Sequence, residues 1–133
     1  MRAVNDNRHF VLDASALLVY LQREPGYATV QKALTDGAVI STVNVAEVYA
    51  KIVQRALPLE DIAANLAALG LSVIPFTEVD ARGSAVIYPR TRRLGLSLGD
   101  RACLALGARL SLPVLSADRS WKGISGVQVD LVR

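Results

Sequence analysis

Short apolar runs alternate along the chain with longer stretches whose apolar residues recur at helical spacing. The short runs predict strands at 9–12, 38–41, 71–76, 113–116 and 127–132. The longer stretches predict helices at 14–24, 27–35, 42–56, 58–69, 78–94 and 97–110. Strands that alternate with helices favour a single three-layer α/β/α domain, in which a five-stranded parallel sheet is covered by helices on both faces.

Proline and glycine set several of these boundaries. Pro25 and Gly26 are expected to stop the first helix, Pro58 to begin the fourth, and Gly70 to close it. Pro89 lies inside the fifth predicted helix. Because proline lacks a backbone N–H and crowds the preceding turn, we expect this helix to kink or split there.

The 133 residues fit one domain, and a hydrophobic content of 52% is ample for a core. We expect a polar N-terminal extension at 1–8 and one folded domain at 9–133. The start of the chain lacks the apolar core of a signal peptide, and no apolar run approaches membrane-spanning length. The sequence therefore predicts a cytoplasmic protein with no membrane partner. Its net charge of +3 permits binding to nucleic acid without requiring it.

The single cysteine and the single histidine restrict the possible chemistry. With Cys103 alone, the chain has no internal disulfide and no cysteine-based zinc or iron–sulfur site. With His9 alone, it has no histidine-rich metal site. Cys103 lies in an apolar helical stretch and is expected to pack in the core, as is Trp121. Any metal site must therefore be built from oxygen ligands.

Ligands of parallel α/β folds bind beyond the carboxyl ends of the strands, so the position of each acidic residue matters. Most of the twelve acids fall in helical first turns, ordinary turns, the polar tail or an edge strand. Four remain, at or near strand ends or in the helix that follows: Asp13, Glu47, Asp100 and Asp118.

Each of these four acids also has a purely structural explanation. Asp13 fits the cap of the next helix, Asp118 fits a turn or a cap, and Asp100 completes a capping box with Ser97. Glu47 is harder to explain, because its neighbours at helical spacing are apolar and predict a buried, unpaired carboxylate.

Considered together, the four carboxylates point to a cation. Three or four carboxylates in one pocket repel one another unless protons or metal ions neutralise them. All-oxygen ligation favours Mg²⁺ or Mn²⁺. Such ions are typical of phosphoryl-transfer sites, so this pattern favours nuclease chemistry.

The segments around the four acids are "VLDASALL", "ISTVNVAEV", "RTRRLGLSLGDRACLALG" and "VLSADRSW". In order and spacing they resemble the PIN-domain ribonucleases, most of all the VapC-type toxins of toxin–antitoxin pairs, over about residues 9–132. The resemblance implies that the four acids form a Mg²⁺ site, with Mn²⁺ able to substitute. It places the hydroxyls of Ser15 and Ser116 beside that site, and Asn44 falls in a matching motif.

The same resemblance implies a metal-dependent endoribonuclease that cuts tRNA, rRNA or mRNA. It also implies a homodimer and a cognate antitoxin whose C-terminal segment covers the active site. A non-catalytic RNA-binding or scaffold module on the same fold is the alternative, and loss of one of the acids would indicate it. A receiver domain or an aspartyl phosphatase is excluded, because Asp13 is followed by Ala14 and Ser15 and the required lysine or second aspartate is missing.

Several arginines lie close to these acids in the sequence. Arg90, Arg92 and Arg93 precede Asp100, and they form either a solvated helix face or contacts to an RNA backbone. Arg101 and Arg119 each adjoin an acid of the predicted site. They are expected either to attract phosphate or to offset carboxylate charge.

Overall fold

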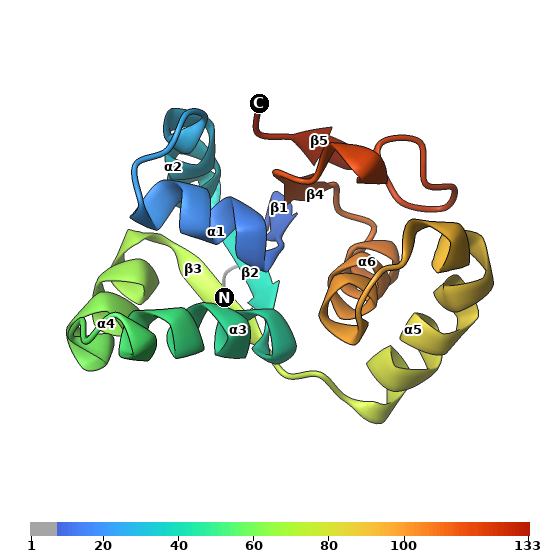
Figure 1. Cartoon of the computed structure of the whole chain (residues 1–133), viewed down its shortest axis with the longest axis horizontal. Coiled ribbons are helices and arrows are strands. Elements are labelled where there is room, and N and C mark those ends of the chain that lie inside the picture. Colours follow the sequence, from blue (N-terminus) through green and yellow to red (C-terminus); the bar gives the residue numbers. More distant parts are fainter. Residues whose placement is uncertain (1–7) are drawn as a thin grey trace, which may run out of the picture.

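The computed structural model describes residues 8–133, so residues 1–7 of the expected extension lie outside the described part. Five strands form one parallel sheet in the order β3-β2-β1-β4-β5 (Figure 1). Their bounds are β1 Phe10–Leu12, β2 Ala38–Ser41, β3 Leu71–Ile74, β4 Val114–Ser116 and β5 Val129–Leu131. The predicted α/β architecture with a five-stranded parallel sheet is confirmed.

Six helices and two short 3-10 turns connect the strands. The helices are α1 Ala14–Leu21, α2 Tyr27–Asp36, α3 Thr42–Gln54, α4 Leu59–Leu69, α5 Glu78–Thr91 and α6 Leu98–Leu110. The 3-10 turns are η1 Arg92–Leu94 and η2 Arg119–Trp121. Within residues 8–133, none of these helices is both long enough and apolar enough to cross a membrane.

The two faces of the sheet bury alternate residues of the same strands. On one face, Leu12, Ile40 and Leu115 pack with residues of α1 to α4. On the other face, Val11, Val39 and Val114 pack with α6, where Cys103 and Trp121 are also buried. Because neighbouring strand residues point to opposite faces, these continuous apolar strands supply two cores. The predicted burial of Cys103 and Trp121 is confirmed.

Some predicted boundaries were wrong by a few residues. The first helix ends at Leu21 instead of continuing to residue 24, because Arg23 adopts a left-handed backbone with φ 54°. The strand predicted at 71–76 ends at Ile74, directly before Pro75, which has no N–H for a ladder hydrogen bond.

Pro89 does not split its helix, so one of the two expected outcomes is wrong. Helix α5 passes through Pro89 to Thr91 and only then tightens into η1. Pro89 and Ala85, four residues earlier, are both exposed, so water can satisfy the carbonyl that proline leaves without a partner.

Helix α5 is anchored to α6 by an ion pair. Asp80 is only 3% exposed, and it accepts hydrogen bonds from Nε and Nη2 of Arg109 at 2.7 and 3.3 Å. Asp80 also completes the capping box of α5 by accepting from the Thr77 backbone N–H. This pair fixes the α5–α6 unit that carries Asp100.

Candidate metal centre at the carboxyl edge of the sheet

Asp13 lies directly after the central strand β1 and caps α1. Its Oδ1 accepts from the backbone N–H of Ala16 at 2.7 Å, the N-cap bond predicted from sequence. The hydroxyl of Ser15 donates to Oδ1 at 2.8 Å and to Oδ2 at 2.9 Å, and the hydroxyl of Ser116 donates to Oδ2 at 2.6 Å. The two serines beside the predicted site therefore both contact Asp13.

The Asp13 carboxylate is buried, with 4% of the residue exposed. Burial raises the pKa of Asp13, the hydrogen bonds from Ser116, Ala16 and Ser15 lower it, and the charge of Asp100 raises it further. The net direction is upward. A second negative charge therefore acts on Asp13 without a resident positive partner, which is the electrostatic environment that a cation relieves.

Glu47 lies on α3 against the first turn of α6. Asn44 links the two helices, because its Nδ2 donates to Oε1 of Glu47 at 3.2 Å and to the carbonyl of Gly99 at 2.9 Å. A Cβ at Gly99 would stand only 2.7 Å from Oε2 of Glu47. In this conformation the carboxylate lies directly over Gly99, and a side chain there would make the end of Glu47 shift.

The expectation that Glu47 is buried and unpaired was wrong. The residue is exposed, and its carboxylate has Asn44 as a partner. Two of its neighbours at helical spacing, Ala50 and Lys51, are exposed as well. The side chains of α3 that face the core, such as Val48, lie on another side of the helix, so solvent reaches Glu47.

Asp100 and Asp118 also serve as caps. Asp100 and Ser97 form the predicted capping box, with Oδ2 of Asp100 accepting from the Ser97 N–H at 2.9 Å. Asp118 is exposed and caps η2, with its Oδ1 accepting from the N–H and the hydroxyl of Ser120 at 3.0 and 2.7 Å. Ser116 joins this end to Asp13, because its Oγ accepts from the Asp118 N–H at 3.0 Å.

Three of the four acids act on one buried group. The pKa of the Cys103 thiol is raised well above its usual value, first by burial and then by the charges of Asp13, Asp100 and Glu47. This thiol lies on α6 within the electrostatic reach of all three carboxylates. Within residues 8–133, however, no three carboxylate, histidine or cysteine side chains lie close enough together to enclose a metal ion as they stand.

The donor set still fits a hard divalent cation. Mg²⁺ keeps several waters and commonly binds only one or two carboxylates directly. Among the described residues, one oxygen each of Glu47, Asp100 and Asp118 has no hydrogen-bond donor: Oε2, Oδ1 and Oδ2. The buried Oδ1 of Asn44 also lacks a partner there. These are all oxygen ligands of the kind that Mg²⁺ or Mn²⁺ takes.

The predicted arginines do not form one group. Arg101 lies between α5 and α6, where it donates to the Ser84 carbonyl at 3.3 Å and stacks over Tyr88. Arg119 donates to the Arg133 carbonyl at 2.7 Å. Residues Arg90, Arg92 and Arg93 are all exposed at the end of α5 and in η1.

Two residues that matter to this region were not singled out from the sequence. Gly99 was not chosen, because its role depends on the approach of a carboxylate from another helix. Lys122 was not chosen either, although the chain brings it to the same pocket as Arg90 and Arg93. Neither residue has a local sequence signal that would have identified it.

The structure is an α/β domain with a five-stranded parallel sheet and with acidic side chains beyond the carboxyl ends of its strands. The PIN domain model matches residues 10–127. The chain belongs to the PIN domain family.

Solved structures share the fold at low sequence identity. A toxin–antitoxin complex from Klebsiella pneumoniae contains a chain with TM-score 0.75 and 17% identity, covering 92% of this chain and 97% of that one. A chain of DNA-bound VapBC from Salmonella typhimurium has a TM-score of 0.74 and 16% identity, and the match covers 95% of this chain and 99% of that one. Mycobacterium tuberculosis VapC20, described as a sarcin–ricin loop cleaving toxin, has a TM-score of 0.67 and 14% identity. The match covers 90% of this chain and 98% of that one. A comparison with curated protein sequences finds no match.

Proposed function

We propose that this protein is a Mg²⁺-dependent endoribonuclease that acts as the toxin of a toxin–antitoxin pair. The observation that carries the proposal is the buried Asp13 carboxylate at the end of the central strand, held by Ser15 and Ser116 and repelled by Asp100. Family membership and the toxin structures that share the fold support it.

In this proposal Asp13, Glu47, Asp100 and Asp118 hold the ion, directly or through water. A bound Mg²⁺ polarises the phosphodiester and lowers the pKa of an attacking water. A carboxylate has about four lone-pair sites. Three donors reach Asp13 through four contacts, because Ser15 shares its single hydroxyl proton between both oxygens, so a cation or its water would displace one of the two Ser15 contacts.

Asp118, Glu47 and Asp100 would have roles that differ from that of Asp13. Asp118 accepts both its bonds on Oδ1, and Oδ2 is available to orient water or to take its proton. Asn44 holds Glu47 against the first turn of α6, which carries Asp100. Glu47 and Asp100 would therefore reach the ion from the same side, where α3 contacts α6.

The direct test is cleavage of single-stranded RNA with Mg²⁺ or Mn²⁺ by the wild-type protein and by Asp13→Asn. We expect cleavage by the wild type only. Equal cleavage by both proteins would show that Asp13 has no catalytic role. RNA binding without turnover under either ion would instead favour the non-catalytic module.

Metal binding can be tested without activity. A cation that relieves repulsion between carboxylates should raise the melting temperature of the wild type, because it binds the folded state only. Asp13→Asn should reduce that increase. An unchanged melting temperature at millimolar Mg²⁺ would argue against a metal site.

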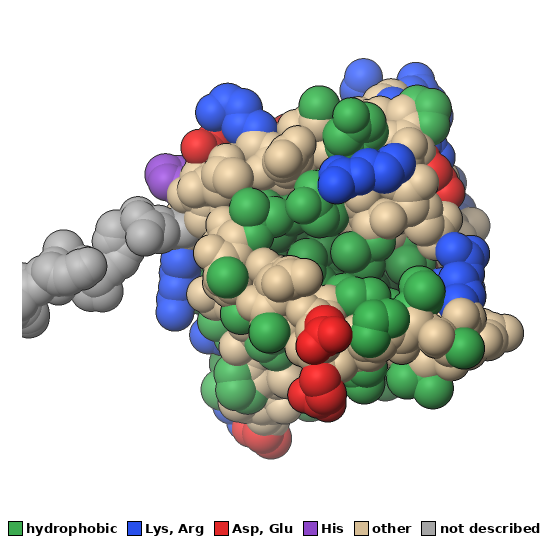
Figure 2. All heavy atoms as spheres, turned by 90° about the vertical axis from the view of Figure 1, so that its left-hand side faces the viewer, with side chains coloured by type: hydrophobic (Ala, Val, Ile, Leu, Met, Phe, Trp, Pro, Cys, Tyr) green, Lys and Arg blue, Asp and Glu red, His purple; other side chains and the backbone are tan. Residues whose placement is uncertain are grey.

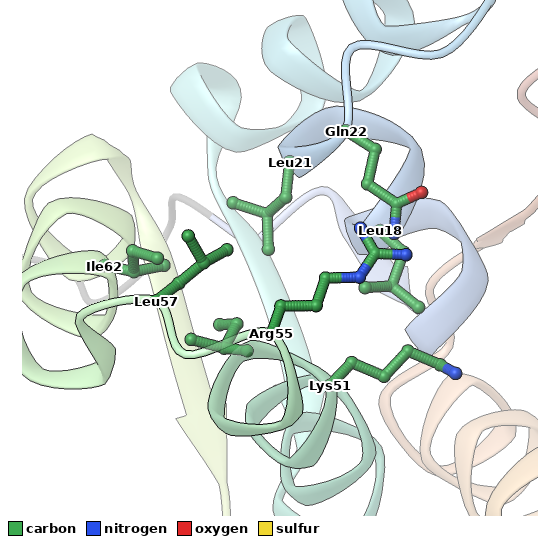
Figure 3. A pocket seen from close by; sticks show the side chains of 8 residues that line it. Leu18, Leu21, Gln22, Lys51, Arg55, Leu57 and Ile62 are labelled. Atoms are coloured by element: carbon green, nitrogen blue, oxygen red, sulfur yellow. The ribbon is translucent and has the colours of Figure 1, made fainter.

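The antitoxin has a suitable docking surface in a groove between α1, α3 and α4. Leu18, Leu21, Leu57 and Ile62 line it, and Lys51 and Arg55 extend along its rim (Figure 3). On the side of the molecule that carries α4, hydrophobic side chains gather in a hollow with basic side chains near its margin (Figure 2). Such a groove fits an amphipathic segment with acidic residues facing Lys51 and Arg55.

The groove also extends to the acids. A second hollow shares Leu18, Gln22, Lys51 and Arg55 with it and reaches Ser15 and Ala117, which border Asp13. A segment seated in the groove would therefore end over the candidate metal centre.

Co-purification with the product of an adjacent short reading frame tests this surface. We expect Leu57→Asp, at a side chain 48% exposed in the groove, to weaken the complex. Val86→Asp, 63% exposed on α5, is the matched control and should not. Equal retention of the partner by both variants would place the antitoxin elsewhere.

A further inference from the structure

A basic pocket lies at the end of α5 and shares no lining residue with the antitoxin groove. It has a volume of about 550 Å³ and lies between the end of α5, η1 and the loop from η2 to β5. Arg90, Arg93 and Lys122 contribute positive charge, and Leu94 and Ile124 contribute apolar surface. No carboxylate occurs among the described residues that line it.

The pocket is shaped around one of its cations. Nη1 of Arg90 donates to the carbonyl of Ser125 at 3.3 Å, which ties the end of α5 to the loop. Gly126 has φ +88° and passes so close to Arg90 that a Cβ there would collide with Nη1. The positive φ favours glycine at this position, and the missing side chain lets the guanidinium lie against the loop.

The three cations are not neutralised by neighbouring acids. The ion pairs within residues 8–133 involve Lys32, Arg82, Arg109 and Arg133, and none involves Arg90, Arg93 or Lys122. Three like charges around one hollow repel one another, and a bound anion offsets that repulsion.

The pocket shares a residue with the candidate metal centre. Ser120 lines the pocket, and its hydroxyl donates to Oδ1 of Asp118 at 2.7 Å. A ligand that enters the pocket is therefore one side chain away from an acid of the candidate site.

We propose that Arg90, Arg93 and Lys122 bind a backbone phosphate of single-stranded RNA next to the phosphate that is cleaved. This inference rests on the proposed function. The cluster of acids repels a polyanion, so a strand that crosses it needs positive charge nearby to hold it. The apolar sides can contact ribose or base surfaces, and contacts from the three cations to phosphate would position the strand without reading its sequence.

The test measures binding of a short fluorescein-labelled single-stranded RNA of mixed sequence by anisotropy. All proteins carry Asp13→Asn, so that binding is separated from cleavage. The probe variant is Arg93→Gln with Lys122→Gln, which leaves the Arg90–Ser125 hydrogen bond intact. The control is Lys32→Gln with Arg82→Gln, which removes the same charge from two exposed ion pairs elsewhere. Melting temperatures establish that both variants fold.

We expect about tenfold weaker binding by the probe variant, and a salt dependence shallower by about 1.4, since each contact to single-stranded nucleic acid contributes roughly 0.7 to the slope. The control should bind as the parent does. Unchanged affinity in the probe variant, or an equal loss in the control, would overturn the proposal. So would unchanged RNA binding combined with a weakened antitoxin complex, which would assign the pocket to the protein partner.

The outcomes also separate this inference from the proposed function. If the wild type cleaves RNA and the probe variant binds it normally, only the pocket assignment fails. If the probe variant loses affinity but the wild type cleaves no RNA with Mg²⁺ or Mn²⁺, the pocket assignment stands and the nuclease proposal fails.

Discussion

Asp13 and Asp118 use the same local arrangement in opposite environments. Each caps a helical turn, and each accepts a serine hydroxyl, from Ser116 at 2.6 Å and from Ser120 at 2.7 Å. Ser116 and Asp13 are buried, whereas Ser120 and Asp118 are exposed. The length of a hydrogen bond therefore does not determine its contribution to stability. Water can replace the hydroxyl of Ser120 as a donor, whereas it cannot reach the position of Ser116.

The difference suggests a division of labour. Asp13 is surrounded by three protein donors and does not need solvent to hold its position. Asp118 keeps one oxygen without a donor among the described residues and lies where substrate can reach it. We interpret Asp13 as a carboxylate held in one position by the protein, and Asp118 as a carboxylate that can change its position or its partners.

Activity should show the largest contrast between the two acids. In RNA cleavage with Mg²⁺, we expect Asp13→Asn to reduce kcat by about a thousandfold and Asp118→Asn by about tenfold to a hundredfold. The reason is that the rigid ligand has no replacement, whereas water can stand in for the exposed one. A larger loss for Asp118→Asn would reverse the proposed division.

Stability should distinguish the two serines. Ser116→Ala removes a donor from a buried carboxylate, so we expect the free energy of unfolding to fall by about 1–3 kcal/mol. Ser120→Ala should change it by less than about 0.5 kcal/mol, since water replaces the lost donor. Urea unfolding of both variants at neutral pH without metal is the measurement. Equal effects would mean that burial does not govern these bonds.

The smallest effect concerns pH. Because the pKa of Asp13 is raised in the folded protein, the folded state holds this proton more tightly than the unfolded chain does. The contribution of Asp13 to stability is therefore fully present below its unfolded value, near 3.8, and is lost as pH rises through the folded pKa.

Melting temperatures without metal should show this loss. As pH rises from about 4 towards neutrality, the melting temperature of Asp13→Asn should rise relative to that of the wild type, by a few degrees at most. Asp118→Asn is the matched control, because its carboxylate is solvated. A constant difference across this pH range would show that burial of Asp13 has no net electrostatic cost.

The elements of the fold could be predicted from sequence because their signals are local. The strand at 38–41 was predicted with its observed bounds, since a short apolar run follows Asp36-Gly37. The capping roles of Asp13 and Asp100 were also predictable, because each cap depends on residues within one helical turn.

Other features depend on contacts between distant segments. The exposure of Glu47 follows from which face of α3 packs on the core, and its approach to Gly99 follows from the contact between α3 and α6. Lys122 joins Arg90 and Arg93 only because the loop after β4 folds onto the end of α5. Whether Pro89 splits its helix could not be predicted, because the cost of the missing hydrogen bond depends on whether water reaches the carbonyl left without a partner.

The capping roles of the acids have a consequence for regulation. Asp13, Asp100 and Asp118 each lie at the start of a helical turn, where backbone N–H groups already hold the carboxylates in position. The ligands would therefore stay arranged when a cation leaves. A chelator should silence such a protein without unfolding it, and resupply of the ion should restore it at once. Under the proposed toxin function, the supply of the ion would then control the activity reversibly, independently of any protein inhibitor.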